Sequence, residues 1–199
     1  MTVVVGSTRA AGAAVESALI GRTFFRRNLA CGQIAFGGFW TGRAILAGDV
    51  TGAALIVALS AVLVATVVVI LGGLRRVGQV ARPDFSHPTV RRSIRRLTWA
   101  TVAQLLGSLA LATLIARLGW DAWTLPSLVT TIGLFLVIAG IDLAVIITAR
   151  LGGVMVVGSM LAPVALDASI SPGVLAAGTA ALLVASGLAC FAAARDTAG

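Results

Sequence analysis

Long apolar runs that do not alternate with polar residues are the feature that most limits how this chain can fold. The run AALIVALSAVLVATVVVILGGL fills residues 53–74 and is continuous. Because 59% of the 199 residues are hydrophobic and only 11% are charged, a water-soluble fold has too little polar surface to cover them. In lipid, only helices and closed barrels satisfy the backbone, and a barrel requires alternating segments of about 10 residues. The sequence therefore predicts an all-α integral membrane protein.

Six transmembrane helices are predicted, packed as a bundle that forms a single membrane domain over residues 1–199. The expected spans are 29–48, 53–74, 98–118, 126–148, 152–168 and 173–194. The first span is rich in glycine and carries Arg43. The fifth span contains Pro163 and is close to the minimum of about 17 residues that crosses the hydrocarbon core. These two spans depart most from an ordinary apolar helix.

The arginines predict an orientation for this bundle. Threading the six spans through a membrane places thirteen of the fifteen arginines on one side. Since cytoplasmic loops carry such an excess, both termini are expected in the cytoplasm, with the segment 1–28 and the basic loop 75–97. All basic residues are arginine, and alanine, glycine and valine are abundant, which is typical of a GC-rich bacterial genome. The expected location is a bacterial cytoplasmic membrane, crossed several times.

Part of the basic loop is predicted to be an amphipathic helix at the cytoplasmic interface. Residues 88–97 place Val90, Ile94 and Leu97 on one stripe, and the helix is expected to run directly into the third span. A second interfacial helix is expected at 8–27. Four arginines of the helix at 88–97 are expected to contact anionic lipid headgroups, each contributing about 1 kcal/mol to membrane binding: Arg91, Arg92, Arg95 and Arg96. Nucleic acid is not an expected partner, because no aromatic residues are interleaved with the basic ones.

Polar residues inside spans are costly in lipid and are often functional. Gln33, Gln104 and Asp142 are expected in the cytoplasmic half of the bundle, with Gln104 facing Asp142 across a short hairpin. In the functional interpretation, Asp142 takes up and releases a proton with the two glutamines as neighbours. In the structural interpretation, its carboxyl is a packing group satisfied by Arg150 or by the glutamines. The two interpretations remain open.

Helical spacing predicts which faces of the third and fourth spans meet. Thr101, Gln104 and Ser108 share a face of the third span. Thr131 and Asp142 share a face of the fourth span. Two glycines occupy its opposite face, where close packing against another helix is expected: Gly133 and Gly140.

Two charged residues are expected in the outer half of the bundle. Arg43 and Asp167 lie at compatible depths, and a guanidinium–carboxylate pair would offset part of the penalty for burying either charge. This pair would act as a clamp between helices. Alternatively, Arg43 beside Trp40 binds an anionic or aromatic ligand from the outer side.

No catalytic residue, metal site or cofactor is predicted. The single histidine, His87, lies in a loop, and metal or haem ligation requires several ligands within reach of one another. Cys31 and Cys190 are expected to be reduced and to pack as small apolar residues. No hydrolase, zinc or phosphate-binding motif occurs.

Three classes of function remain. A small-molecule or ion transporter, or a substrate-binding permease subunit coupled to protons through Asp142, is the first. A non-catalytic accessory or structural subunit of a larger membrane complex, or a homo-oligomer, is the alternative. An intramembrane enzyme is the third. A cavity shared by the polar faces of the first, third and fourth spans would favour a transporter, whereas a closed bundle with an exposed face of small residues would favour a subunit.

Overall fold

The computed structural model describes residues 4–47, 83–165 and 172–195, together with residues 52, 56–57, 60, 62–64, 66–67 and 71–72. The named helices are α1 (Val4–Leu46), α3 (Pro88–Leu118), the 3-10 helix η1 (Asp121–Trp123), α4 (Thr124–Asp142), α5 (Ile146–Ala165) and α6 (Pro172–Arg195). The residues described between 56 and 72 are also helical, and no described residue forms a strand. The predicted all-helical fold is confirmed, and the six-helix count is consistent with it.

Among the described residues, three helical segments are long and apolar enough to cross a membrane: Pro88–Leu118, Asp121–Asp142 and Pro172–Ala194. The segment Ile146–Leu161 is a shorter apolar helix. On α3, large side chains such as Leu105, Leu109 and Leu114 are exposed, an arrangement that lipid or another apolar surface stabilises. The chain therefore has the character of a membrane protein. The predicted first span, within α1, is not among the three segments because its glycines and polar residues lower its hydropathy.

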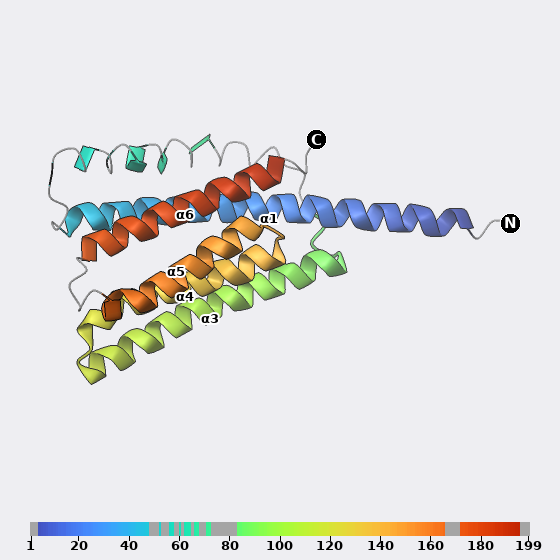
Figure 1. Cartoon of the computed structure of the whole chain (residues 1–199). Helices are drawn as coiled ribbons and strands as arrows, with labels where there is room; N and C mark the ends of the chain where they lie inside the picture. The colour runs from blue at the N-terminus through green and yellow to red at the C-terminus, as the bar shows by residue number, and fades with distance from the viewer. Residues whose placement is uncertain are drawn as a thin grey trace.

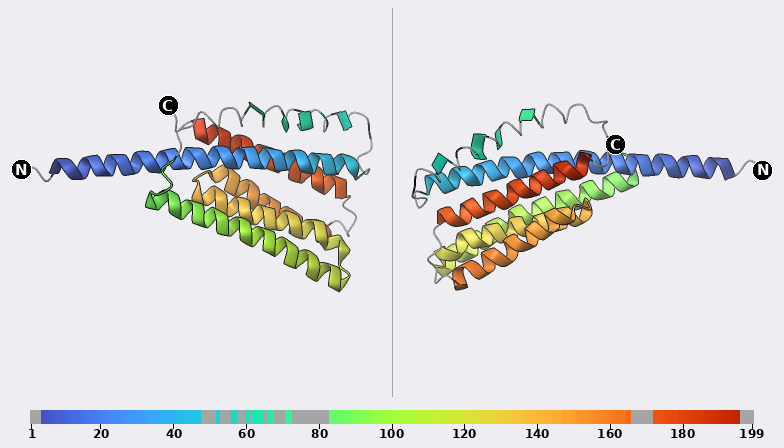
Figure 2. Two further views of the ribbon diagram at one scale, coloured as in Figure 1. Left: turned by 180° about the vertical axis from the view of Figure 1, so that it is seen from behind. Right: turned by 45° about the horizontal axis from the view of Figure 1, so that its top comes forward.

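The helices pack as neighbouring pairs (Figures 1 and 2). Helix α1 runs along α6, α4 runs along α5, and α3 lies along the side of α4 opposite to α5. Helix α1 also approaches the start of α3, where the buried side chain of Val90 packs against Gly21. In the described part of the chain, α3 packs against α4 far more than against α1, so the polar faces predicted on the first and third spans have little contact with each other.

Helix α1 is one continuous helix of 43 residues. The segment 8–27, which was predicted to be a separate interfacial helix, and the first span from residue 29 therefore belong to a single element. No proline occurs in this stretch to interrupt the hydrogen-bond ladder. The N-terminal part of α1 projects beyond the ends of the other helices (Figures 1 and 2).

The amphipathic helix and the third span also form one element, as predicted. Helix α3 begins at Pro88, preceded by a turn in which Asp84 Oδ1 accepts hydrogen bonds from Ser86 N (2.9 Å) and Ser86 Oγ (2.6 Å). These bonds lower the pKa of the exposed Asp84 carboxyl, since they favour its ionised form. Val90 is buried and Ile94 is half-buried, while the four arginines of the basic stretch are exposed. Val90, the first residue of the apolar stripe, therefore packs against α1.

The turn between α4 and α5 lies earlier than predicted. Helix α4 ends at Asp142 rather than at residue 148, and α5 begins at Ile146 rather than at 152. Val145 N donates to Gly140 O (2.8 Å) and Ala144 N donates to Ile141 O (3.2 Å), the pattern of a Schellman motif. Hydropathy missed this turn because its own residues are apolar: Leu143 and Val145 are buried in the core.

Replacing Ala144 with glycine is expected to raise the free energy of unfolding by about 1 kcal/mol. Ala144 has a φ of 54°, a left-handed conformation in which its Cβ is strained and glycine is not. Thermal unfolding in detergent, followed by tryptophan fluorescence, measures the change. The matched control is Gly119→Ala, because Gly119 closes α3 with a φ of 68° and its substitution should destabilise the protein. A loss of stability in Ala144→Gly would contradict the left-handed turn.

Two buried apolar clusters fill the bundle. The larger cluster joins α1, α4, α5 and α6, and its bulkiest members are Trp40, Leu136, Met155 and Leu183. The smaller cluster contains Ala30, Leu143, Val145 and Cys190. The two clusters occupy successive levels along the same four helices.

Candidate functional site

The carboxylate of Asp142 forms an ion pair with Arg96. The distance from Arg96 Nη1 to Asp142 Oδ1 is 3.1 Å, and the exposed fractions of the two side chains are 63% and 8%. The second carboxylate oxygen, Oδ2, is buried and has no hydrogen-bond partner. Because Asp142 is the last residue of α4, its charge lies at the negative end of the helix dipole, and the guanidinium of Arg96 offsets that repulsion. The pair ties α3 to α4.

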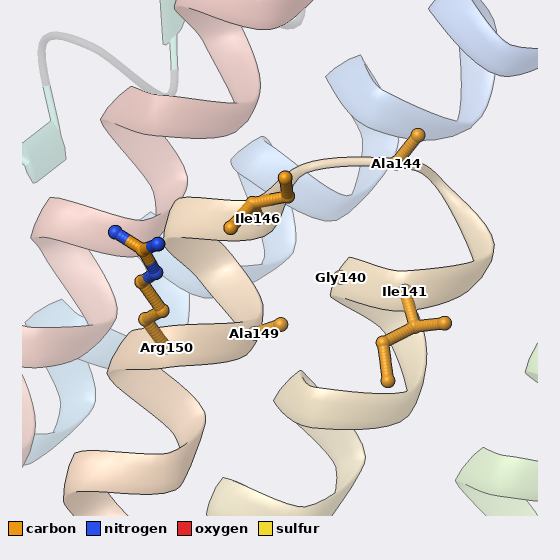
Figure 3. Close-up of a pocket in the computed structure, with 6 residues that line it drawn as sticks. All are labelled: Gly140, Ile141, Ala144, Ile146, Ala149 and Arg150. Atoms are coloured by element: carbon orange, nitrogen blue, oxygen red, sulfur yellow. The ribbon is translucent and has the colours of Figure 1, made fainter.

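This partner was not predicted. The sequence indicated Arg150 or the glutamines as partners of Asp142 and assigned Arg96 to lipid headgroups. The shifted turn explains the error for Arg150, which lies inside α5 rather than in a loop. In Figure 3, Arg150 extends from the side of α5 opposite to Ala149, away from α4. It lines a pocket of about 490 Å³ at the α4–α5 turn, together with Gly140, Ile141, Ala144, Ile146 and Ala149.

The predicted polar faces of the third and fourth spans do meet. The hydroxyl oxygens of Ser108 on α3 and Thr131 on α4 are 2.7 Å apart and share a hydrogen bond. Gln104 is half-buried on the same face of α3, one turn closer to its start. The predicted approach of the two faces is therefore correct, but Asp142 bonds to Arg96 and not to Gln104.

Arg26 is a buried charged residue whose contacts were not predicted from the sequence. Its Nε donates to Leu143 O (3.0 Å) and its Nη1 donates to Ala193 O (2.8 Å). These carbonyls lie at the C-terminal ends of α4 and α6, where the helices leave acceptors unsatisfied and favour a cation. The side chain is only 7% exposed. A signal was available, because Arg26 shares a helical face with Ala30 and Gly37, both buried against α6.

Gln33 is buried in α1, and the structure does not bring it to Asp142 or Gln104. It is 4% exposed, and both its Oε1 and its Nε2 have no hydrogen-bond partner. It thus keeps its place as a candidate binding residue, separately from the inner ion pair.

The outer pair is only partly described. Arg43 is exposed near the end of α1, whereas Trp40 is buried in the larger apolar cluster. Trp40 therefore does not form an exposed site with Arg43. Asp167 lies outside the described residues, so the predicted Arg43–Asp167 pair stays a prediction.

The remaining groups capable of chemistry make local contacts. Among the described residues, no group of three or more His, Cys, Asp or Glu side chains could hold a metal ion. His87 Nδ1 lies 2.8 Å from Thr89 Oγ1 at the start of α3. Both cysteines are free thiols, and Cys190 Sγ lies 3.2 Å from Thr148 Oγ1.

Three pockets are formed by described residues, and none of the predicted binding residues lines them. One is at the α4–α5 turn, one of about 100 Å³ lies between Gly21 and Val90 with Arg22 at its wall, and one is formed by residues 119–123. Comparison with protein-family models, with curated proteins and with solved structures finds no match to this chain. The site must therefore be interpreted from its own geometry, which joins helices to one another.

Proposed function

We propose that this chain is a non-catalytic accessory subunit of a larger assembly in a bacterial cytoplasmic membrane. The observation that carries this proposal is that the charged side chains of the bundle's inner end connect helices. Arg96 and Asp142 join α3 to α4, and Arg26 joins α1 to the ends of α4 and α6. A transporter requires polar faces that converge on a path, and none of the three pockets described above is lined by Gln33, Gln104 or Asp142.

In this proposal the six spans place both termini in the cytoplasm. The exposed arginines at the start of α3 then lie at the inner headgroup level, where anionic lipid attracts them: Arg91, Arg92, Arg95 and Arg96. Arg96 serves two partners, since its guanidinium is largely exposed while one of its nitrogens bonds to Asp142. The projecting part of α1 extends on the same side as the start of α3 (Figure 1) and offers the assembly a further surface.

Helix α6 carries the surface that best suits a neighbouring membrane helix. Its exposed positions recur at helical spacing, and most are small: Val174, Gly178, Ala181, Ala185, Leu188 and Ala192. In lipid, helices associate through small residues that let their backbones approach closely. A helix of the partner subunit is expected to lie along this stripe.

Replacing Ala181 and Ala185 together with leucine is expected to release the partner, because the added side chains separate the two helices. The protein would be purified in mild detergent, and the amount of copurifying polypeptide measured against wild type. A loss of roughly tenfold, corresponding to about 1.4 kcal/mol, is expected. The matched control is Ala110→Leu, a similar change at an exposed alanine of α3.

Two outcomes would contradict the proposal. Wild-type protein that purifies only with copies of itself would indicate a homo-oligomer instead of an accessory subunit. Wild-type protein that purifies alone and moves a solute across liposome membranes would indicate the transporter.

A further inference from the structure

A buried layer that contains both polar and apolar residues separates the two apolar clusters. On each of four helices, buried residues fall between the larger cluster and the smaller one, and we define a level by one of them from each helix. These four residues are Gln33 on α1, Ala139 on α4, Thr148 on α5 and Ser186 on α6. Three of them carry polar side chains. The bundle therefore has apolar packing on either side of a polar level.

Gln33 and Ser186 belong to the same level, as the contact next to them shows. A Cβ added at Gly187 would lie 2.6 Å from the side chain of Ile34, so the residues that follow Ser186 and Gln33 touch each other. From α5, Thr148 Oγ1 lies 3.5 Å from the backbone oxygen of Ser186. Three helices thus place polar residues at neighbouring positions.

The polar side-chain atoms of Gln33 and Ser186 are not satisfied by the protein. Gln33 Oε1, Gln33 Nε2 and Ser186 Oγ are buried and have no hydrogen-bond partner. Thr148 differs, because its hydroxyl is engaged with Cys190 Sγ at 3.2 Å. Buried polar groups in native proteins are almost always hydrogen-bonded, and lipid offers no partner. Three unsatisfied atoms on two neighbouring helices are groups that a bound water or other small polar molecule would satisfy.

We propose that the layer of Gln33 and Ser186 binds an uncharged hydrogen-bonding guest, of which water is the smallest. None of the four residues of this level is ionisable, and an isolated ion in such surroundings would be strongly disfavoured. The amide of Gln33 both donates and accepts, and the hydroxyl of Ser186 does the same. A buried water makes two to four such bonds, which matches the atoms available.

This inference goes beyond the accessory role, because the guest is held inside one chain and needs no partner. It predicts that the bundle is stabilised at its centre by the guest's hydrogen bonds, between two dry clusters. The experiment below uses the purified chain alone, so its outcome is independent of any copurifying subunit.

Nuclear magnetic resonance on protein labelled with ¹⁵N-glutamine tests for the guest directly. The chain has three glutamines, Gln33, Gln79 and Gln104, and the signal lost in Gln33→Met assigns the buried amide. A cross-peak from the Gln33 side-chain N–H protons to long-lived water or to another small molecule is expected. Absence of any such cross-peak in the folded protein would overturn the proposal.

The direction of the stability change provides the second test. If a guest satisfies the layer, Gln33→Met and Ser186→Ala should each lower the midpoint of thermal unfolding by about 3 °C or more. The double variant should lose less than the sum, because both residues bind the same guest. The control Gln104→Met, at a half-buried glutamine of α3, should change it little. If the layer is dry, Gln33→Met removes an unsatisfied amide, and a raised midpoint would overturn the proposal.

Discussion

Replacing Arg26 with glutamine is expected to lower the free energy of unfolding by about 3 kcal/mol or more. Arg26 donates to Leu143 O and Ala193 O, which lie at the ends of two helices, and its side chain is 7% exposed. Glutamine is shorter and uncharged, so it leaves at least one buried carbonyl without a donor and removes the cation from two helix C-termini. Unfolding in detergent, monitored through the four tryptophans, measures the loss.

The neighbouring arginine provides the matched control for this experiment. Arg27 is half-buried and is one residue away on α1, so Arg27→Gln removes the same charge without removing the two carbonyl contacts. Its effect is expected to stay within about 0.5 kcal/mol, as for other surface substitutions. Arg26→Lys should recover only part of the stability, because an ammonium group cannot reproduce the planar fork of the guanidinium. Equal losses in Arg26→Gln and Arg27→Gln would show that the contacts with α4 and α6 do not hold the bundle together.

The second large effect is expected at Gly152, where the backbones of α4 and α5 lie close together. A Cβ at this position would lie 2.6 Å from Gly133 O and 2.8 Å from Val137 N. Backbone atoms cannot rotate aside as a flexible side chain can, so the two helices must separate. Gly152→Ala is therefore expected to lower the free energy of unfolding by about 1–3 kcal/mol.

The adjacent Gly153 provides the control for Gly152. A Cβ at Gly153 would have no atom within 4 Å, apart from its own neighbours. Gly153→Ala is expected to stabilise the helix by up to about 1 kcal/mol, because alanine favours helix more than glycine does. Opposite signs at two successive glycines, measured by the same unfolding assay, would establish the α4–α5 contact. Destabilisation of similar size at both positions would contradict it.

Several elements were predictable because their signals are local. The continuous apolar runs indicate helices in lipid, and the stripe of Val90, Ile94 and Leu97 identifies the amphipathic start of α3. The glycines on one face of α4 were correctly assigned to close packing, since a Cβ at Gly133 would lie 2.8 Å from Gly152 O. The polar face containing Ser108 was also correctly directed toward α4. Each of these features depends on the spacing of residues within one helix.

The errors have a common physical cause in the uniform hydropathy of the chain. The turn at Leu143–Val145 is as apolar as the helices that it joins, so hydropathy carries no sign of it. Because the turn comes earlier than predicted, Asp142 is the last residue of α4 and Arg150 lies within α5. An arginine is assigned by sequence to the headgroup level whether it is exposed, as Arg91 is, or buried, as Arg26 is. The position of an arginine along its helix does not reveal whether its side chain is exposed or buried.

Composition and residue spacing are enough to identify the class of this protein: an all-helical chain with segments suited to a membrane. They do so because the exclusion of apolar side chains from water depends on composition and on spacing along one segment. Only the tertiary structure decided which polar groups meet. Arg26 bonds to residues 117 and 167 positions away, and Asp142 pairs with Arg96 at a separation of 46. Such pairings depend on which helices become neighbours, and many neighbour arrangements bury the same apolar surface equally well.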